Sequence, residues 1–326
     1  MKRLKTIIRL AQNLSLGLGL VFATGCTSLV VTKTVGFPGL PPLANANDVN
    51  LVDAGTPINQ PYQVVGAVTV FRRSFANTQQ PLDNGYCSWR IRELAADMGA
   101  DGVIGVHQNW GVDTKFKTPI PVVSGLTVKW LAPGEVKRPL TKPFVVAVLP
   151  MAEDAEEVPG GQTVTRSGAG KNRTETTTQA KPVKNNHKEL TEAVDKAVVC
   201  PLETKGYYVL PSDNITFKGG LEGARDLSDT ELKSLGGDDA SLLLEVDVLT
   251  KAHGTIILQS SSSVTAKSTL MDKATRKQVY QDNGIGTITL GWIVNMMVDK
   301  EIAATAGAAA GSLINIPSIG DVVQSK

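Results

Sequence analysis

The stretch HKELTEAVDKAVVCPLETKGYYVLP, residues 187–211, decides the fold of the larger part of this chain. Apolar residues recur at helical spacing from Leu190 to Val198 and predict an amphipathic helix. Pro201 is expected to kink this helix, and Gly206 is placed to end it in the left-handed conformation that glycine tolerates. YYVLP then has the aromatic and β-branched residues typical of a buried strand. The stretch therefore predicts a helix that passes through one glycine into a strand.

The same order of helix, glycine and strand occurs twice more. It is present in CSWRIRELAADMGADGVIGVHQNW, residues 87–110, and in LSDTELKSLGGDDASLLLEVDVL, residues 227–249. MGAD at residues 98–101 and LGGD at residues 235–238 hold the same place in the two stretches. Helices and strands that follow one another in this way predict an α+β fold.

Two small, sandwich-like α/β domains are expected. Residues 61–135 form the first, a β-α-β-β unit, and residues 140–326 form the second, a mixed sheet with helices. In the second domain, KPFVVAVLPM at residues 142–151 predicts a buried strand, and a strand with alternating Leu244, Val246 and Val248 is expected later in the chain. Two further strands are expected at residues 255–264 and 264–272, and a last strand is expected at Val279 and Tyr280. The connections after residue 249 are too short for helical crossovers, so antiparallel pairing is expected there.

Two segments outside these units are expected to lack regular structure. Residues 26–60 contain GFPGLPPLANAND and are interpreted as a tether. Residues 152–187 have almost no large apolar side chains and are interpreted as a disordered loop inside the second domain. SGAGKN in this loop is no phosphate-binding P-loop, because Thr165 replaces the first glycine and Asn172 the final hydroxyl residue.

The first 25 residues have the three regions of a lipoprotein signal peptide. An apolar core from Leu14 to Ala23 is too short to span a bilayer, and it ends in ATGC at residues 23–26. ATGC resembles a bacterial lipobox, which predicts cleavage between Gly25 and Cys26 and acylation, palmitate included, at Cys26. The alternative is an ordinary secretory signal that leaves Cys26 a free thiol. Four basic residues precede the core: Lys2, Arg3, Lys5 and Arg9.

The net charge of the chain without its signal peptide argues against a nucleic-acid partner. Subtracting the four positive charges of the signal from the formal net charge of +2 leaves −2, so no nucleic-acid partner is expected.

The apolar carboxyl segment from Trp292 is interrupted by Asp299, Lys300 and Glu301, which a bilayer centre would not tolerate. The small residues 303–311 permit close approach of another backbone, so a helix here is expected to dock on its own domain or on a second subunit.

Four stretches resemble a known lipoprotein family. These are VVAVLPM, AVVCPLETKGYYVLP, LGGDDASLLLEVDVL and a D-x-x-T-x-K-x-V-Y turn, and together they span roughly residues 140–305. They are similar to the outer-membrane lipoproteins typified by a genome-derived Neisseria antigen, a family related in fold to the TolB amino-terminal domain and the periplasmic part of CsgG. LAADMGADGVIGV, within residues 62–131, is similar to a phrase of YbjQ-like domains. The resemblance implies a lipid-anchored protein on the periplasmic face of the outer membrane, without known catalysis.

Candidate chemistry was sought among the histidines, cysteines and carboxylates. His107, His187 and His253 are far apart in sequence, so neither a metal site nor a cofactor is predicted. No nucleophile motif is present, and no enzyme activity is predicted. Asp101 and Asp238 follow helix-ending glycines and are expected to bind nearby backbone amides, and Trp89 is expected in the core. Cys87 and Cys200 are either buried thiols or a disulfide.

These features are compatible with two functions. The first is a non-enzymatic envelope lipoprotein, anchored through Cys26, that binds protein partners as an accessory or assembly factor of an outer-membrane or secretion system. The alternative is a periplasmic module that binds a small ligand or a cell-wall polymer. A homo-oligomer is left open in both.

Overall fold

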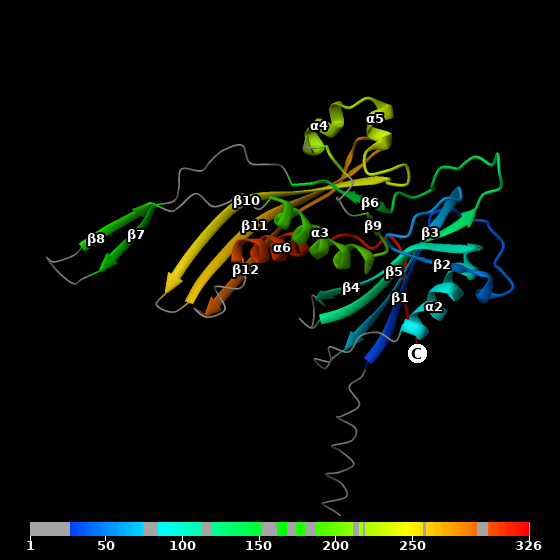
Figure 1. Cartoon of the computed structure of the whole chain (residues 1–326), viewed down its shortest axis with the longest axis horizontal. Helices are drawn as coiled ribbons and strands as arrows, with labels where there is room; N and C mark the ends of the chain where they lie inside the picture. Colours follow the sequence, from blue (N-terminus) through cyan, green and yellow to red (C-terminus); the bar gives the residue numbers. More distant parts are fainter. Residues whose placement is uncertain are drawn as a thin grey trace, which may run out of the picture. The chain divides into compact units, whose positions relative to one another are not determined.

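The computed structural model describes residues 27–74, 84–112, 119–151, 162–167, 174–179, 187–210, 215–217, 219–256, 259–291 and 299–325. The chain divides into two compact units. Unit 1 comprises Met1–Val146, Ala197–Val209 and Leu313–Lys326, and unit 2 comprises Ala147–Lys196 and Leu210–Ser312. The fold is mixed α+β, as predicted, with a large sheet in each part (Figure 1).

Unit 1 is built on a six-stranded sheet with the order β13-β1-β3-β5-β4-β2. All neighbouring strands are antiparallel except β2 and β4, which are parallel. Helix α2 packs on one face over an apolar core that includes Val68, Ile91 and Val103. The strands are β1 (Thr27–Val35), β2 (Asn50–Asp53), β3 (Tyr62–Ser74), β4 (Gly102–Val112), β5 (Pro119–Trp130) and β13 (Asp321–Ser325), and α2 is Asn84–Asp97.

The tether predicted for residues 26–60 is wrong where the chain forms two strands and a short helix. Residues Thr27–Val35 form β1, in the interior of the sheet between β3 and β13, and Asn50–Asp53 form β2. A short 3-10 helix, η1 (Ala46–Asp48), lies between them. The reason is the β-rich sequence TSLVVTKTV, whose Val30, Val31 and Thr32 are all buried. The first unit is therefore larger than the predicted domain at residues 61–135.

A five-stranded sheet has the order β12-β11-β10-β6-β9, and the division between the units falls within β6 and β9. The long strands β10, β11 and β12 are antiparallel, as predicted. The two strands expected at residues 255–264 and 264–272 are wrong, because β10 runs on to Ile256 and one strand, β11, covers Gln259–Asp272. The strands are β6 (Val145–Val148), β9 (Tyr208–Leu210), β10 (Leu242–Ile256), β11 (Gln259–Asp272) and β12 (Gln278–Gly291).

Four helices accompany this sheet. They are α3 (His187–Glu203), α4 (Gly220–Asp226), α5 (Asp229–Ser234) and α6 (Lys300–Ser312). In unit 2, α4 and α5 cover an apolar cluster that includes Leu221, Leu232 and Met271. Helix α3 contains Pro201, and Gly206 follows it with φ +91°, as the sequence predicted. Of the parts of the chain described here, no helix has the length and hydropathy needed to cross a membrane.

Helix α6 docks on its own sheet, which is one of the two placements predicted for it. It packs against β11 and β12 in unit 2. Gly284 and Gly286 of β12 lie so close to the helix that a β-carbon on either would overlap the helix backbone near Ala304 and Ala308. The close approach needs small residues on both sides, which explains the Ala-rich and Gly-rich sequence of α6. Trp292, at which the apolar carboxyl segment begins, lies outside the described residues.

The predicted disordered loop contains two strands. β7 (Gln162–Ser167) and β8 (Thr174–Gln179) pair antiparallel and form a sheet of their own. Together the two strands are rich in threonine, which favours extended backbone, and Ser167, the first residue of SGAGKN, is the last residue of β7. The prediction of disorder is therefore wrong for these two segments.

Candidate functional site

A row of polar side chains crosses the sheet of unit 1. Thr32 of β1 pairs with Thr69 of β3, Thr69 pairs with Ser124 of β5, and Ser124 pairs with His107 of β4. Directly paired residues point to the same face of a sheet, so the four side chains share one face. Thr32, Thr69 and Ser124 are fully buried. Their flanking residues on β3 and β5 belong to the apolar core under α2, so the row lies on the opposite face.

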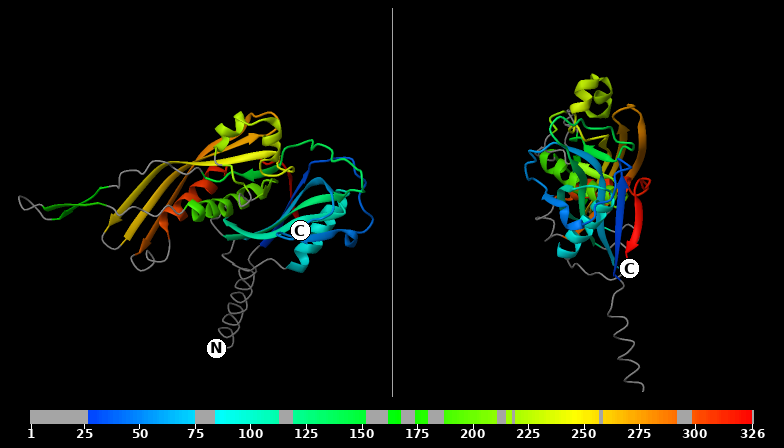
Figure 2. Two further views of the ribbon diagram at one scale, coloured as in Figure 1. Left: turned by 45° about the horizontal axis from the view of Figure 1, so that its top comes forward. Right: turned by 90° about the vertical axis from the view of Figure 1, so that its right-hand side faces the viewer.

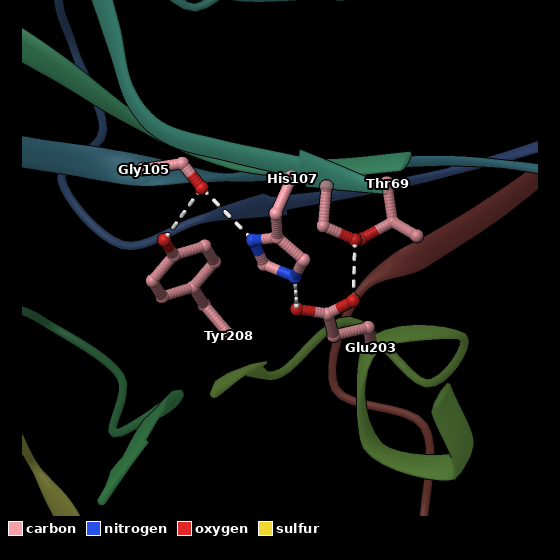
Figure 3. Close-up of polar contacts among 6 residues, drawn as sticks. Thr69, Gly105, His107, Glu203 and Tyr208 are labelled. Carbon is pink, nitrogen blue, oxygen red and sulfur yellow. Dashed lines mark hydrogen bonds and ion pairs between the residues drawn. The ribbon is translucent and has the colours of Figure 1, made fainter. Parts of the chain in front are cut away.

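Glu203, at the carboxyl end of α3, binds this row. Its side chain is completely buried. Ser124 Oγ donates to Glu203 Oε2 at 2.7 Å, and His107 Nε2 lies 2.8 Å from Glu203 Oε1 (Figure 3). Ser124 Oγ is also 3.0 Å from Thr69 Oγ1, and since its one proton goes to the carboxylate it accepts from Thr69. Both carboxylate oxygens are thus occupied by unit 1 partners.

His107 carries a proton on both ring nitrogens. Nδ1 is 2.9 Å from the carbonyl oxygen of Gly105, which can only accept, and Nε2 faces the Glu203 carboxylate. Burial alone lowers the pKa of His107, but the hydrogen bond and the charge of Glu203, with the Gly105 bond, outweigh it and raise the pKa from 6.5 to about 9. His107 and Glu203 are therefore an ion pair at neutral pH.

A bulge in β4 shapes the site around Gly105. The pairing of β4 with β5 shifts between Ile104 and His107, and Gly105 has φ +62°. The Gly105 carbonyl accepts a second hydrogen bond from Tyr208 Oη at 3.0 Å, and a β-carbon on Gly105 would overlap that hydroxyl (Figure 3). Burial, followed by the Glu203 charge, raises the pKa of Tyr208, which stays a neutral donor. Only glycine satisfies both the positive φ and the close approach.

Two further contacts hold the turn after α3 in place. Thr34 Oγ1 of β1 donates to the carbonyl of Gly206 at 2.6 Å, in a buried position. The backbone nitrogen of Ile319 donates to the carbonyl of Lys205 at 2.8 Å. β1 and the segment before β13 thus hold the turn that follows Glu203.

The arrangement is that of a structural ion pair and does not form a nucleophile and its base. Ser124 donates to Glu203 and has no hydrogen bond to His107, and it is fully buried. Both ring nitrogens of His107 already face acceptors, so neither is available to take a proton. Within the described ranges, no group of His, Cys, Asp and Glu side chains could hold a metal ion.

The other residues singled out from the sequence are dispersed. His187 begins α3 and His253 lies in β10, both in unit 2, whereas His107 is in unit 1. Cys87 and Cys200 are both buried and are not joined in a disulfide. Trp89 is half exposed, at 50%, so its expected place in the core is wrong. Cys26 and the signal peptide lie outside the described residues.

The two aspartates after the helix-ending glycines differ in their contacts. Asp101 Oδ1 accepts from the backbone nitrogen of Trp130 at 2.8 Å, and its Oδ2 is 3.1 Å from Lys129 Nζ. These partners are on the neighbouring strand β5, so the bond is long-range and does not close a local turn. The charge of Asp238 raises the pKa of the buried Lys273, against the larger effect of burial, which lowers it.

Sequence reasoning missed Glu203, Ser124, Thr69 and Tyr208. The available signal was a hydroxyl or carboxyl residue at a position that the strand or helix pattern buries, because a buried polar group must find a partner. The pattern alone does not say which partner, since Ser124 and Glu203 are 79 residues apart.

The comparisons with known proteins point to one lipoprotein family. The profile of the family "Putative lipoprotein GNA1162-like" matches residues 179–307. No curated protein matches this chain in sequence.

Two solved structures are distantly similar to this chain. Lipoprotein GNA1162 from Neisseria meningitidis is 17% identical, with 49% of this chain and 90% of that chain covered, at a TM-score of 0.27. The hypothetical protein CT253 from Chlamydia trachomatis is 14% identical, with 45% and 73% covered, also at 0.27. These likenesses are too distant to carry an argument. The resemblance predicted over residues 140–305 is confirmed where the family profile matches, over residues 179–307.

Proposed function

We propose that this protein is a non-enzymatic lipoprotein of the bacterial envelope, acylated at Cys26 and held on the periplasmic face of the outer membrane. There it binds protein partners as an accessory or assembly factor. The lipoprotein family matched at residues 179–307 supports the envelope location. The lipobox at residues 23–26 supports the anchor. Thr27 follows the cysteine, and by resemblance to the sorting of enterobacterial lipoproteins the lack of aspartate there favours transfer to the outer membrane.

The observation that carries the proposal is the start of β1 at Thr27, directly after the lipobox cysteine. A residue of extended chain spans about 3.5 Å, so an acyl chain on Cys26 would hold the first strand of unit 1 at the bilayer surface. This strand lies inside the sheet, paired on both sides. The anchor would thus be fixed to a rigid body and not to a flexible linker.

The absence of catalysis in the proposal rests on the site in unit 1. Its serine is buried, and its histidine is committed to Glu203 and Gly105. The ion pair joins the end of α3 to the strand face and so serves the fold.

The proposal is tested by fractionation and cross-linking of cells that express the full chain. Wild type should fractionate with the outer membrane, and Cys26→Ala should lose this attachment; Cys87→Ala, a buried cysteine, is the control that should keep it. Cross-linking should recover envelope proteins with wild type and not with Cys26→Ala. Outer-membrane attachment of Cys26→Ala would contradict the anchor, and specific sedimentation with peptidoglycan without protein partners would contradict the partner role.

A further inference from the structure

The exposed aromatic side chains of the described chain gather at one end of unit 1. Tyr86, Trp89 and Trp110 are 38%, 50% and 45% exposed, and every other exposed large apolar side chain of the described residues is aliphatic. Tyr86 and Trp89 lie in the first two turns of α2, with their ring centroids 6.0 Å apart. Trp110 lies near the end of β4. Single exposed apolar side chains are ordinary, but exposed aromatic side chains that gather at one place are typical of an interaction surface.

The strand register places Trp110 at the end of the sheet where β1 begins. Val30, Phe71, Val122 and Asn109 are paired in one row across β1, β3, β5 and β4. β3 is antiparallel to β1 and therefore runs towards the end of the sheet at which β1 starts. β5 is antiparallel to both β3 and β4, so β4 runs in the same direction as β3. Trp110, the residue after Asn109, is therefore one position nearer to that end, level with Leu29.

Helix α2 begins at the same end. β3 finishes at Ser74, which pairs with Thr27, and α2 starts ten residues later at Asn84. The helix finishes near the start of β4 at Gly102, which lies at the opposite end of the sheet because it pairs with Val128. Figures 1 and 2 show the first turn of α2, in cyan, beside the start of β1, in blue, with β13, in red, next to β1. Tyr86 and Trp89 thus share the end that holds Thr27.

We propose that this end of unit 1, the aromatic rim formed by Tyr86, Trp89 and Trp110, rests in the headgroup region of the phospholipid membrane to which Cys26 is attached. The inference rests on the proposed acylation of Cys26. From Cys26 to the level of Leu29 an extended chain spans about 10 Å, so an anchored Cys26 brings the rim to the interface. Tryptophan and tyrosine favour this depth because the ring is apolar and the N–H or O–H stays hydrated.

The charge of the same end fits a phospholipid surface. β3 ends with Arg72 and Arg73 before Ser74, and Arg72 pairs with Leu29 of β1. Basic residues beside interfacial aromatics are attracted by lipid phosphates. A second copy of the chain or another protein would not require the aromatics to gather at the anchor end. The membrane is therefore the occupant that accounts for their position.

The test uses the lipidated full chain in phosphatidylethanolamine and phosphatidylglycerol vesicles whose acyl chains carry bromine, a short-range quencher of tryptophan. Wild type should be quenched, and Trp89→Phe with Trp110→Phe should lose most of this quenching. Trp130→Phe is the matched control, because Trp130 pairs with Tyr62 at the opposite end of the sheet, and it should keep the quenching. If quenching is lost only in Trp130→Phe, the proposed membrane contact of the aromatic rim is wrong. It is also wrong if the acylated wild type shows no quenching.

A second preparation separates this inference from the proposed function. The mature chain can be coupled through the Cys26 thiol to a maleimide lipid, since Cys87 and Cys200 are 2% and 3% exposed. If cells do not acylate Cys26, the proposed function fails, yet the coupled chain still reports on the rim. A separate measurement uses an uncoupled chain that carries Cys26→Ser. Replacing Trp89 and Trp110 by glutamate in this chain should lower its partitioning onto unmodified vesicles by about tenfold. Unchanged partitioning, or a dimer formed through the rim, would contradict membrane contact.

Discussion

Glu203 is a carboxylate with no exposure to water, and it is retained in unit 1 because its partners replace its hydration. A buried charge costs several kcal/mol unless it is paired and hydrogen-bonded, and Glu203 has both an imidazolium and a hydroxyl donor. The bulge at Gly105 supplies the acceptor that orients His107 from its other side. Each polar group therefore depends on the next, and removal of one leaves another unsatisfied.

The first prediction concerns Glu203→Gln. Without the carboxylate, burial dominates the His107 environment, so the pKa of His107 should fall from about 9 to below 6.5, which an NMR titration of the three histidines would follow. The free energy of unfolding should fall by about 3 kcal/mol at pH 6. Glu93→Gln is the control: its pair with Arg90 is partly exposed, so a loss under about 1 kcal/mol is expected. A His107 that still titrates near 9 in Glu203→Gln would refute the pairing.

The second prediction is a pH dependence of stability. His107 has a higher pKa in the folded than in the unfolded chain, so its contribution is complete below pH 6.5 and is lost as the pH rises through about 9. The loss should be on the order of 3 kcal/mol. Lys273 acts oppositely, because burial lowers its pKa to about 8 and stability is gained above that pH. Urea unfolding of wild type minus His107→Gln isolates the histidine, and a difference that is constant from pH 6 to 9.5 contradicts the prediction.

At this scale, the sequence identifies His107 but not its role. His107 stands out as one of three histidines, but no carboxylate lies next to it in sequence to suggest an ion pair. Glu203 is 96 residues away, and only the register of β4 with β5 and the end point of α3 bring the two together. Such long-range pairing is a property of the assembled sheet, which a local pattern does not encode.

At the scale of helices and strands, the repeated order of helix, glycine and strand predicts where helices end. Gly99 and Gly236, in the two related stretches, have the same φ of +73°, as expected for glycines that end helices. The tether was misjudged because the Pro-rich GFPGLPPLANAND dominated the interpretation of residues 26–60. TSLVVTKTV before it has strand character, but its partners are β3 and β13, the second nearly 300 residues away.

The third prediction tests how α6 docks, with two glycines that face each other. A valine at Gly286 would overlap the backbone of α6, so Gly286→Val should lower the melting temperature by several degrees, corresponding to about 3 kcal/mol. On the helix side, a β-carbon at Gly307 meets only Gly286 Cα at 3.6 Å, an ordinary contact. Gly307→Ala should therefore be neutral or stabilising by up to about 1 kcal/mol. Equal effects of the two substitutions would show that the helix does not approach β12 through these glycines.

The whole molecule is organised around a first unit assembled from three separate segments of the chain. β1 and β13 come from opposite ends of the sequence and lie side by side, and the end of α3 completes the unit through Glu203. The sequence predicted the α+β class and two units, but it assigned each unit a continuous range. That assignment failed because strand order depends on pairing between distant residues.

The central claim is that Cys26 carries the membrane anchor directly in front of β1. The most direct measurement is the mass of the amino-terminal peptide of the full chain purified from bacterial membranes. The account predicts a peptide that begins at Cys26, lacks residues 1–25, and carries diacylglycerol with a further acyl chain on its amino group. A peptide that retains residues 1–25, or that begins elsewhere with an unmodified Cys26, would contradict it.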